Sequence, residues 1–243
     1  MAVQNDQAVV LKLSDYSETS QIVTLFTERH GLSRLIAKGV RRSTKKSFAA
    51  GLDLCEYGEV SFAPPRGDAT LGTLTEWRQR DAFTGLRADL KRQYGAYYAS
   101  ELVARLTEEY DPHGELFANL LELLRRLTDA ETDPGACIVR FQGLLLKAIG
   151  YAPLLRRCVH CGKPRMKGTR AYFSSGAGGM ICRDCEMSHT EKIRISPRML
   201  DEPAGAQRPT EWFTLLDYHL THIAGREFAT APRMRRLLEA AVE

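Results

Sequence analysis

The chain has 243 residues, a length that suits one large domain or two modest ones. Hydrophobic residues make up 44% of it, which is enough for a packed core and excludes a generally disordered protein. No stretch approaches the roughly 20 apolar residues of a membrane helix, and the polar residues 1–7 lack the apolar core of a signal peptide. We therefore expect a cytoplasmic protein.

The net charge is only +4, but the charges are segregated along the sequence. Residues 29–46 contain seven Lys or Arg and no acid, and residues 156–183 contain seven more and again no acid. We call these segments the first and second basic windows. Of 34 basic and 30 acidic residues, 20 basic and 30 acidic ones remain for the rest of the chain. Such segregation is what a surface for a polyanion requires.

The first 81 residues show short strand-like runs separated by turn signals. Alternation in the first run predicts Val9, Leu11 and Leu13 on one face. Five short strands in this length predict a small barrel of the OB-fold type, which we assign to residues 1–81. The expected strands are Gln7–Leu13, Ile22–Thr27, Leu32–Val40, Leu54–Phe62 and Ala69–Trp77.

From residue 82 onward the apolar residues recur at helical spacing, which predicts an all-helical domain over residues 82–243. The fold class is therefore α+β, with a barrel followed by helices. Ser196-Pro197 predicts a helix start, with Pro at the first helical position. The apolar helical stretches lie at residues 86–106, 116–127, 138–149, 210–224 and 232–242.

Two C-x2-C pairs, Cys158 with Cys161 and Cys182 with Cys185, are separated by twenty residues. This spacing is typical of a structural zinc site, so we expect one structural Zn²⁺ per chain in an insertion at about residues 151–190. Two disulfides would need an oxidising compartment, and a redox C-x-x-C should follow a strand of a βαβ unit. With four cysteines in place, His160 is expected on the surface rather than on the metal.

Four thiolates would complete a tetrahedron and leave no position open for a reacting water, which argues against a zinc hydrolase. The chain also lacks the H-E-x-x-H, G-x-S-x-G and dinucleotide-binding patterns. Residues 39–45 differ from a P-loop, because Thr44 stands where its second Gly is needed. We predict that the protein is not an enzyme and has no catalytic residues.

The first basic window offers cations beside small hydroxyl residues, a combination that suits nucleic-acid phosphates. The alternative is a solvated loop that is basic only for solubility. The residues that we expect to bind DNA are Arg34, Lys38, Arg41, Arg42, Lys45 and Lys46.

The sequence resembles the RecO family of bacterial recombination mediators along nearly its whole length. In the first half, the similar residues are Tyr16-Ser-Glu18, Leu25-Phe-Thr27, His30-Gly31, Ala37-Lys38-Gly39-Val-Arg41-Arg42, Phe83, Leu86-Arg87-Ala-Asp89-Leu90, Glu101-Leu102 and Leu116-Phe117. In the second half, they are Gly150-Tyr151-x-Pro153-x-Leu155-x-x-Cys158-x-x-Cys161-Gly162 and Phe173-Ser174-x-x-x-Gly178-Gly179-x-x-Cys182-x-x-Cys185.

The resemblance implies a non-enzymatic mediator of DNA repair that binds single- and double-stranded DNA and anneals complementary strands. It implies contacts with RecR and with the acidic C-terminal tail of single-stranded DNA-binding protein, which would dock on the helical domain. Through these contacts the protein would help to load RecA onto DNA in the bacterial nucleoid. The alternative from the residues alone is a zinc-ribbon adaptor that binds RNA or an acidic protein partner.

Overall fold

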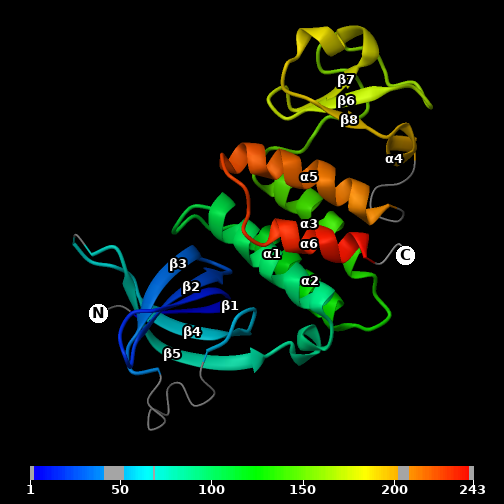
Figure 1. Ribbon diagram of the computed structural model, residues 1–243. Coiled ribbons are helices and arrows are strands. Elements are labelled where there is room, and N and C mark those ends of the chain that lie inside the picture. The colour runs from blue at the N-terminus through cyan, green and yellow to red at the C-terminus, as the bar shows by residue number, and fades with distance from the viewer. Residues whose placement is uncertain (1–2, 41–51, 68, 202–207, 241–243) are drawn as a thin grey trace. The chain divides into compact units, whose positions relative to one another are not determined.

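The computed structural model describes residues 3–40, 52–67, 69–201 and 208–240 (Figure 1). The chain forms two compact units, residues 1–131 and 132–243. The first unit contains the strands of a barrel and two helices, and the second contains the remaining helices and a small sheet. We propose that the boundary between the barrel and the helices lies between residues 81 and 82, because the last barrel strand ends at Asp81.

The barrel is closed, and its strands follow the order β1-β2-β3-β5-β4, with β4 paired back onto β1. This confirms the five-stranded, OB-like barrel that the sequence predicts. Neighbouring strands are antiparallel except β3 and β5, which pair in parallel through only three residue pairs. The strands are β1 Gln4–Asp15, β2 Gln21–Thr27, β3 Gly31–Ala37, β4 Tyr57–Ala63 and β5 Gly72–Asp81.

A register shift in β1, between Val10 and Lys12, changes which side chains enter the barrel. Before the shift, Ala8 and Val10 belong to the interior cluster; after it, Leu13 packs against the same cluster. The expected common face of Val9, Leu11 and Leu13 is therefore wrong, because an extra residue in a strand reverses the inside-outside alternation.

Strand β2 is buried on both faces, as its run of apolar residues predicts. Val23 and Leu25 point into the barrel, whereas Phe26 faces the other way, with its ring centroid 6.1 Å from that of Phe117 in helix α2 (Gly114–Thr128). Eleven buried residues fill the barrel: Ala8, Val10, Val23, Leu25, Leu35, Ala37, Val40, Val60, Phe62, Leu74 and Trp77.

The turn between β2 and β3 meets the loop that connects helix α1 (Leu90–Leu106) with α2. Gly31 has φ +68°, and a Cβ atom there would lie 2.0 Å from the carbonyl oxygen of Asp111. The amide of Tyr110 donates to the carbonyl of Leu32 at 3.0 Å. Only glycine combines this backbone conformation with so close an approach, so Gly31 lets the turn lie directly against the loop, where the Tyr110 hydrogen bond holds it.

Helix α1 spans Leu90–Leu106 and α2 spans Gly114–Thr128. A short 3₁₀ helix at Thr84–Ala88 precedes them, and Asp89 separates it from α1 by capping the helix N-terminus. The Asp89 carboxylate accepts from the Arg92 amide at 3.0 Å. An N-cap aspartate satisfies one of the free amides of the first turn, so the expected stripe from residue 86 to 106 divides at this point.

In the second unit, helix α3 spans Pro134–Ala148 and starts with the carboxylate of Asp133 accepting from the amides of Gly135 and Ala136. Its other elements are the strands β6 Ala171–Ser174, β7 Gly179–Cys182 and β8 Ile193–Ile195, and the helices α4 Pro197–Asp201, α5 Pro209–Ala224 and α6 Ala231–Glu239. The three strands form one sheet in the order β7-β6-β8. None of the helices in the described part of the chain combines the length and apolar character that crossing a bilayer requires.

Candidate functional site

The four cysteines of the two C-x2-C pairs converge beside the small sheet. Cys158 and Cys161 lie in the turn that precedes it, Cys182 ends β7, and Cys185 follows in a 3₁₀ helix, Arg183–Ser188. Their sulfur atoms all lie within 4.8 Å of one another, and they are the group of potential metal ligands found among the described residues. We call the segment 151–195 that carries them the four-cysteine module.

The spacing of the sulfurs fits a metal ion and not a disulfide. The Sγ atoms of Cys161 and Cys182 are 3.8 Å apart, whereas a disulfide needs about 2.05 Å. A tetrahedron with Zn–S bonds of about 2.3 Å has ligand separations of about 3.8 Å. These four cysteines could therefore hold a metal ion, and their donor set is that of structural zinc sites.

The protonation of the thiols also favours a cation between them. Burial raises the pKa of Cys158, but backbone amides of Cys161, Cys182 and His160 donate to its sulfur and bring the pKa down to about 6. Burial and the neighbouring sulfurs raise the pKa of Cys185 to about 12. The Cys158 thiolate forms readily, whereas Cys185 resists a negative charge that a bound divalent cation would compensate.

His160, which lies between the first two cysteines, belongs to a different contact. Its Nδ1 atom lies 3.2 Å from Nε2 of His189, and the two rings meet edge to face. The group of converging ligand atoms contains cysteines and neither histidine. His160 is also exposed, which agrees with the expectation that it lies on the surface and is not one of the converging ligands.

The start of the four-cysteine module joins the sheet through the backbone of Leu154. Its amide donates to Gly178 at 3.0 Å, and its carbonyl accepts from the amide of Met180 at 2.8 Å. A Cβ atom on Gly179 would lie 2.5 Å from the Leu154 carbonyl oxygen. The absence of a side chain at residue 179 therefore lets the entering chain lie directly on β7.

A carboxylate that sequence reasoning did not single out anchors the module to helix α5. Glu191 accepts from the hydroxyl of Ser174 at 2.7 Å, from the amides of Ser175 and Gly176 at 3.1 and 3.0 Å, and from the hydroxyl of Tyr218. Burial alone would raise the pKa of Glu191, but these donors bring it down to about 2. The carboxylate is therefore ionised and saturated with donors, which stabilises the turn after β6.

His219 of α5 makes a second link to the module. The Ser175 hydroxyl lies 2.6 Å from its Nδ1 atom, and its Nε2 atom lies 3.0 Å from the Tyr151 carbonyl oxygen. Burial lowers the pKa of His219, which keeps the ring neutral. A neutral ring that donates from Nε2 and accepts at Nδ1 satisfies both contacts. We call Ser174, Ser175, Glu191, Tyr218 and His219 the α5 anchor.

The sequence contains one signal of this anchor. Ser174 stands in the segment from Phe173 to Gly179 on which the family resemblance rests, and its hydroxyl also accepts from the amide of Ala177 at 3.1 Å. Glu191 itself carries no local signal, because its partners lie 15 to 27 residues away along the chain. Only the tertiary fold brings them together.

The structure describes two of the six residues expected to bind DNA. Arg34 lies in β3 with its side chain exposed, and Lys38 is exposed immediately after β3 ends. Nη1 of Arg34 lies 3.6 Å from Oε1 of Glu109, in the loop between α1 and α2. The other four, Arg41, Arg42, Lys45 and Lys46, lie outside the described residues.

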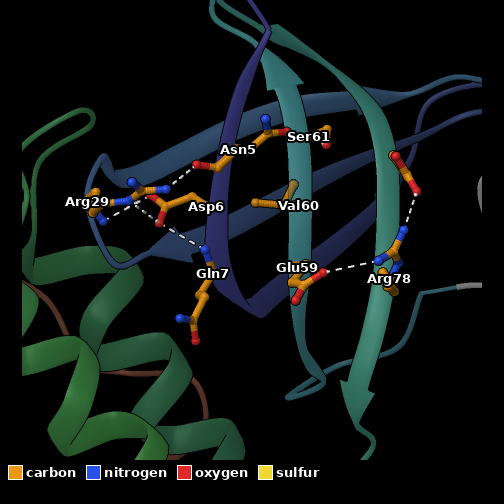
Figure 2. Close-up of a pocket in the computed structure, with 9 residues that line it drawn as sticks. Asn5, Asp6, Gln7, Arg29, Glu59, Val60, Ser61 and Arg78 are labelled. Atoms are coloured by element: carbon orange, nitrogen blue, oxygen red, sulfur yellow. Dashed lines mark hydrogen bonds and ion pairs between the residues drawn. The ribbon is translucent and has the colours of Figure 1, made fainter.

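The barrel also has a hollow of about 390 Å³ on the outer face of β1, β4 and β5 (Figure 2). Its charges suit a polyanion less well than those at the end of β3. Arg29, the first cation of the first basic window, turns toward β1 and pairs with Asp6. Arg78 lies between Glu59 and Glu76, 3.6 and 3.5 Å from their carboxylates. The three carboxylates outnumber the two cations, so this hollow does not attract phosphate groups.

Comparison with known proteins agrees with both units of the structure. The family model described as "Recombination protein O N terminal" matches residues 1–83, and the one described as "Recombination protein O C terminal" matches residues 87–211. The chain is 35% identical over 195 residues to "DNA repair protein RecO" of Rhodopirellula baltica, covering 80% of this chain and 71% of the relative. It is 33% identical over 192 residues to the protein of the same name in Bacillus subtilis, covering 79% and 72%.

The relative in Dehalococcoides mccartyi, also named "DNA repair protein RecO", is 35% identical over 179 residues, which cover 74% of this chain and 68% of the relative. The two family models cover the barrel, the helices α1 to α4 and the segment with the four cysteines. The resemblance that the sequence motifs indicate is thus confirmed over most of the chain. The protein belongs to the RecO family of DNA repair proteins.

Proposed function

We propose that this protein is a non-enzymatic recombination mediator, which binds single- and double-stranded DNA and anneals complementary strands at the bacterial nucleoid. The observation that carries the proposal is the end of β3 in the OB-like barrel. There the exposed residues Arg34 and Lys38 lead directly into the densest part of the first basic window. A barrel edge that presents cations to solvent suits the backbone of a nucleic acid.

The remaining parts of the proposal rest on family membership. RecR and the acidic tail of single-stranded DNA-binding protein are the proposed protein partners, with the tail on the helical region, and RecA is loaded as the outcome. The metal in the proposal is one structural Zn²⁺ per chain, held by Cys158, Cys161, Cys182 and Cys185. When bound it would stabilise the four-cysteine module, and the closed four-sulfur set gives it no role in catalysis.

The first experiment measures the affinity for a fluorescent oligo(dT) over a range of salt concentrations. If phosphate contacts dominate, the logarithm of the association constant should fall against the logarithm of salt by roughly 0.7 per phosphate contacted. Replacing Arg41, Arg42 and Lys45 by Glu should weaken binding to all sequences alike and flatten this slope. Arg125→Glu on the exposed side of α2 serves as a control for introducing a carboxylate in place of a cation.

A salt-independent affinity, or stronger binding of structured RNA in a competition at fixed salt, would contradict the proposal and favour the RNA adaptor. Annealing is tested separately with two complementary labelled strands, which should pair faster with the wild-type protein than with the charge-reversed variant. Binding of RecR and of the acidic tail peptide is measured by titration against the full chain. Metal-dependent nuclease activity in a clean preparation would contradict the non-enzymatic assignment.

A further inference from the structure

The four-cysteine module contains a groove of about 570 Å³, a volume within the range of ligand-binding pockets. One wall is the loop of residues 163–170, and the other is the end of β7 with the residues that follow it. The groove lies entirely within the second unit of the chain. Most of its lining residues belong to the second basic window, which the proposed contact at the end of β3 does not use.

The groove is lined by four cations and one carboxylate. The cations are Lys163, Arg165, Arg170 and Arg183, and the carboxylate is that of Asp184. The lining therefore carries a formal charge of +3, which a tetrathiolate zinc centre beside Cys182 would reduce to +1. The balance stays positive, which favours an anionic ligand.

Two of the cations are available for such a ligand without breaking an internal contact. Arg170 and Arg183 are exposed, and within the described ranges no carboxylate forms an ion pair with either. Lys163 pairs with Asp184 at 3.2 Å, but both side chains are about 70% exposed, at 67% and 74%. An ion pair this exposed contributes little and yields readily to a phosphate.

The fourth cation orders the wall of the groove. Arg165 is only 13% exposed, and it donates to Asp201 Oδ1 at 2.5 Å and to the Leu200 carbonyl at 2.9 Å. The other oxygen of Asp201 accepts from the amide of Gly168 at 3.2 Å. The loop is thereby held in place before a ligand arrives, which lowers the entropy cost of binding.

Apolar groups lie among these charges. Met180 forms part of the groove although it is only 1% exposed, and Met166 at its rim is 70% exposed. A single nucleic-acid strand offers phosphates and unstacked bases together, whereas a duplex presents phosphates and hides the faces of its bases. Cations beside the exposed apolar side chain of Met166 therefore suit the single strand.

We propose that this groove binds a segment of single-stranded nucleic acid, with phosphates at Arg170, Arg183 and Lys163 and a base against the exposed side chain of Met166. The proposal rests on the proposed function, since it adds a second contact for the same class of ligand. It makes the four-cysteine module a binding element in its own right, in addition to the end of β3.

The decisive experiment uses the full-length chain with ¹³C-methyl methionine and titrates it with oligo(dT) at low salt. The chain has six methionines, and two of them line the groove. We expect the methyl signals of Met166 and Met180 to shift in a saturable way. Met187 is 89% exposed in the same module but outside the groove, so its signal should not move.

Charge variants give an independent measurement. Arg170→Gln combined with Arg183→Gln should lower the affinity for oligo(dT) about tenfold at low salt and reduce the salt slope by about 1.4, for two phosphate contacts. The matched control, Arg194→Gln with Arg198→Gln, removes two exposed cations of the same unit outside the groove and should change neither quantity. Unchanged metal content of the variants excludes damage to the cysteine site.

The results that would contradict the groove can be told apart from those that would contradict the proposed function. Binding of oligo(dT) that saturates without shifts at Met166 and Met180 overturns the groove but leaves the proposed function standing. Equal shifts with a duplex overturn the preference for single strands. Equal shifts with a poly-glutamate peptide of the same charge mean that the groove takes an acidic peptide, which also overturns the proposal. If the wild-type protein does not bind oligo(dT) at all, the proposed function itself is contradicted.

Discussion

Glu109 lies 3.6 Å from Arg34 and so places a carboxylate beside one of the cations proposed to contact DNA. Both side chains are partly exposed, Arg34 at 46% and Glu109 at 36%. The carboxylate competes with a phosphate for the guanidinium. Arg34 is therefore not fully available in the free protein, although its own basic window contains no acid.

Replacing Glu109 by Gln should strengthen the binding of single-stranded DNA, because Arg34 then loses its internal partner. Exposed pairs are weak, so we expect a gain of at most about fivefold, with a salt slope steeper by about 0.7. Fluorescence anisotropy against salt concentration measures both. Glu108→Gln removes the same charge from an exposed neighbour, and an equal gain from that control would contradict a specific competition.

Asp6 should make the barrel sensitive to acid. Burial raises its pKa, but the donors His30, Arg29 and Gln7 outweigh burial, and the net pKa is lowered. The stability that Asp6 contributes is therefore present above the unfolded pKa of about 3.9 and is lost as pH falls through the lowered folded value. Urea unfolding between pH 5 and about pH 2.5 should show this loss.

The variant Asp6→Asn tests the same contact at neutral pH. The carboxylate of Asp6 accepts from several donors, whereas the NH₂ group of an asparagine would face one of those donors and could not accept from it. We therefore expect a loss of about 2–4 kcal/mol in the free energy of unfolding. The exposed Glu18→Gln should stay within about 0.5 kcal/mol of the wild type. A difference between the two variants of less than about 1 kcal/mol would mean that the contacts of Asp6 contribute little beyond those of an exposed carboxylate.

The α5 anchor should respond to pH in two steps. His219 has a lowered pKa, so its contribution is complete above the unfolded value of about 6.5 and is lost as pH falls below it. Glu191, with a pKa of about 2, contributes above the unfolded value of about 4.3 and loses its contribution as pH falls toward 2. Limited trypsin digestion at Arg156 and Arg157, measured relative to an unstructured peptide at the same pH, should therefore accelerate as pH falls from about 7.5 to about 5.5.

Glu191→Gln should expose the same cleavage sites at neutral pH, because a neutral amide cannot replace an ionised acceptor of several donors. We expect a loss of about 2–4 kcal/mol in the free energy of unfolding of the second unit. Glu239→Gln, at the exposed end of α6, is the matched control. Identical digestion patterns for the two variants would show that the module is held without this carboxylate.

Metal analysis should find one zinc per chain, and chelation should disorder the four-cysteine module while leaving the barrel folded. Cys158→Ser and Cys182→Ser should abolish the metal, because each removes one of four ligands. Cys137→Ala, which alters a buried cysteine of α3, should retain it. Elemental analysis and the methyl signal of Met180 report the two effects separately.

Local patterns in the sequence predicted the parts of the molecule that depend on local spacing. The two C-x2-C pairs predicted the convergence of sulfurs, and the run Ile22–Thr27 predicted a strand buried on both faces. The alternation of β1 could not be predicted, because the register shift after Val10 depends on its pairing with β2. A single extra residue is invisible to a count of apolar positions.

The charge of the first basic window was harder to interpret from sequence for a similar reason. Counting residues within the window finds seven cations and no acid. In the fold, Asp6 comes to Arg29 from 23 positions before it, and Glu109 comes to Arg34 from the loop after α1. Charge segregation along a chain therefore overestimates the free charge on a surface, since the neutralising groups arrive through tertiary contacts.

The barrel closes through its shortest ladder, in which Leu35, Ile36 and Ala37 pair with residues 72–74 of β5. This seam ends one residue before Lys38, one of the residues proposed to contact DNA. A ligand that restrains the chain beyond β3 should thus slow the opening of the seam. Amide hydrogen exchange at these three residues would then report occupancy of the barrel without any label on the nucleic acid.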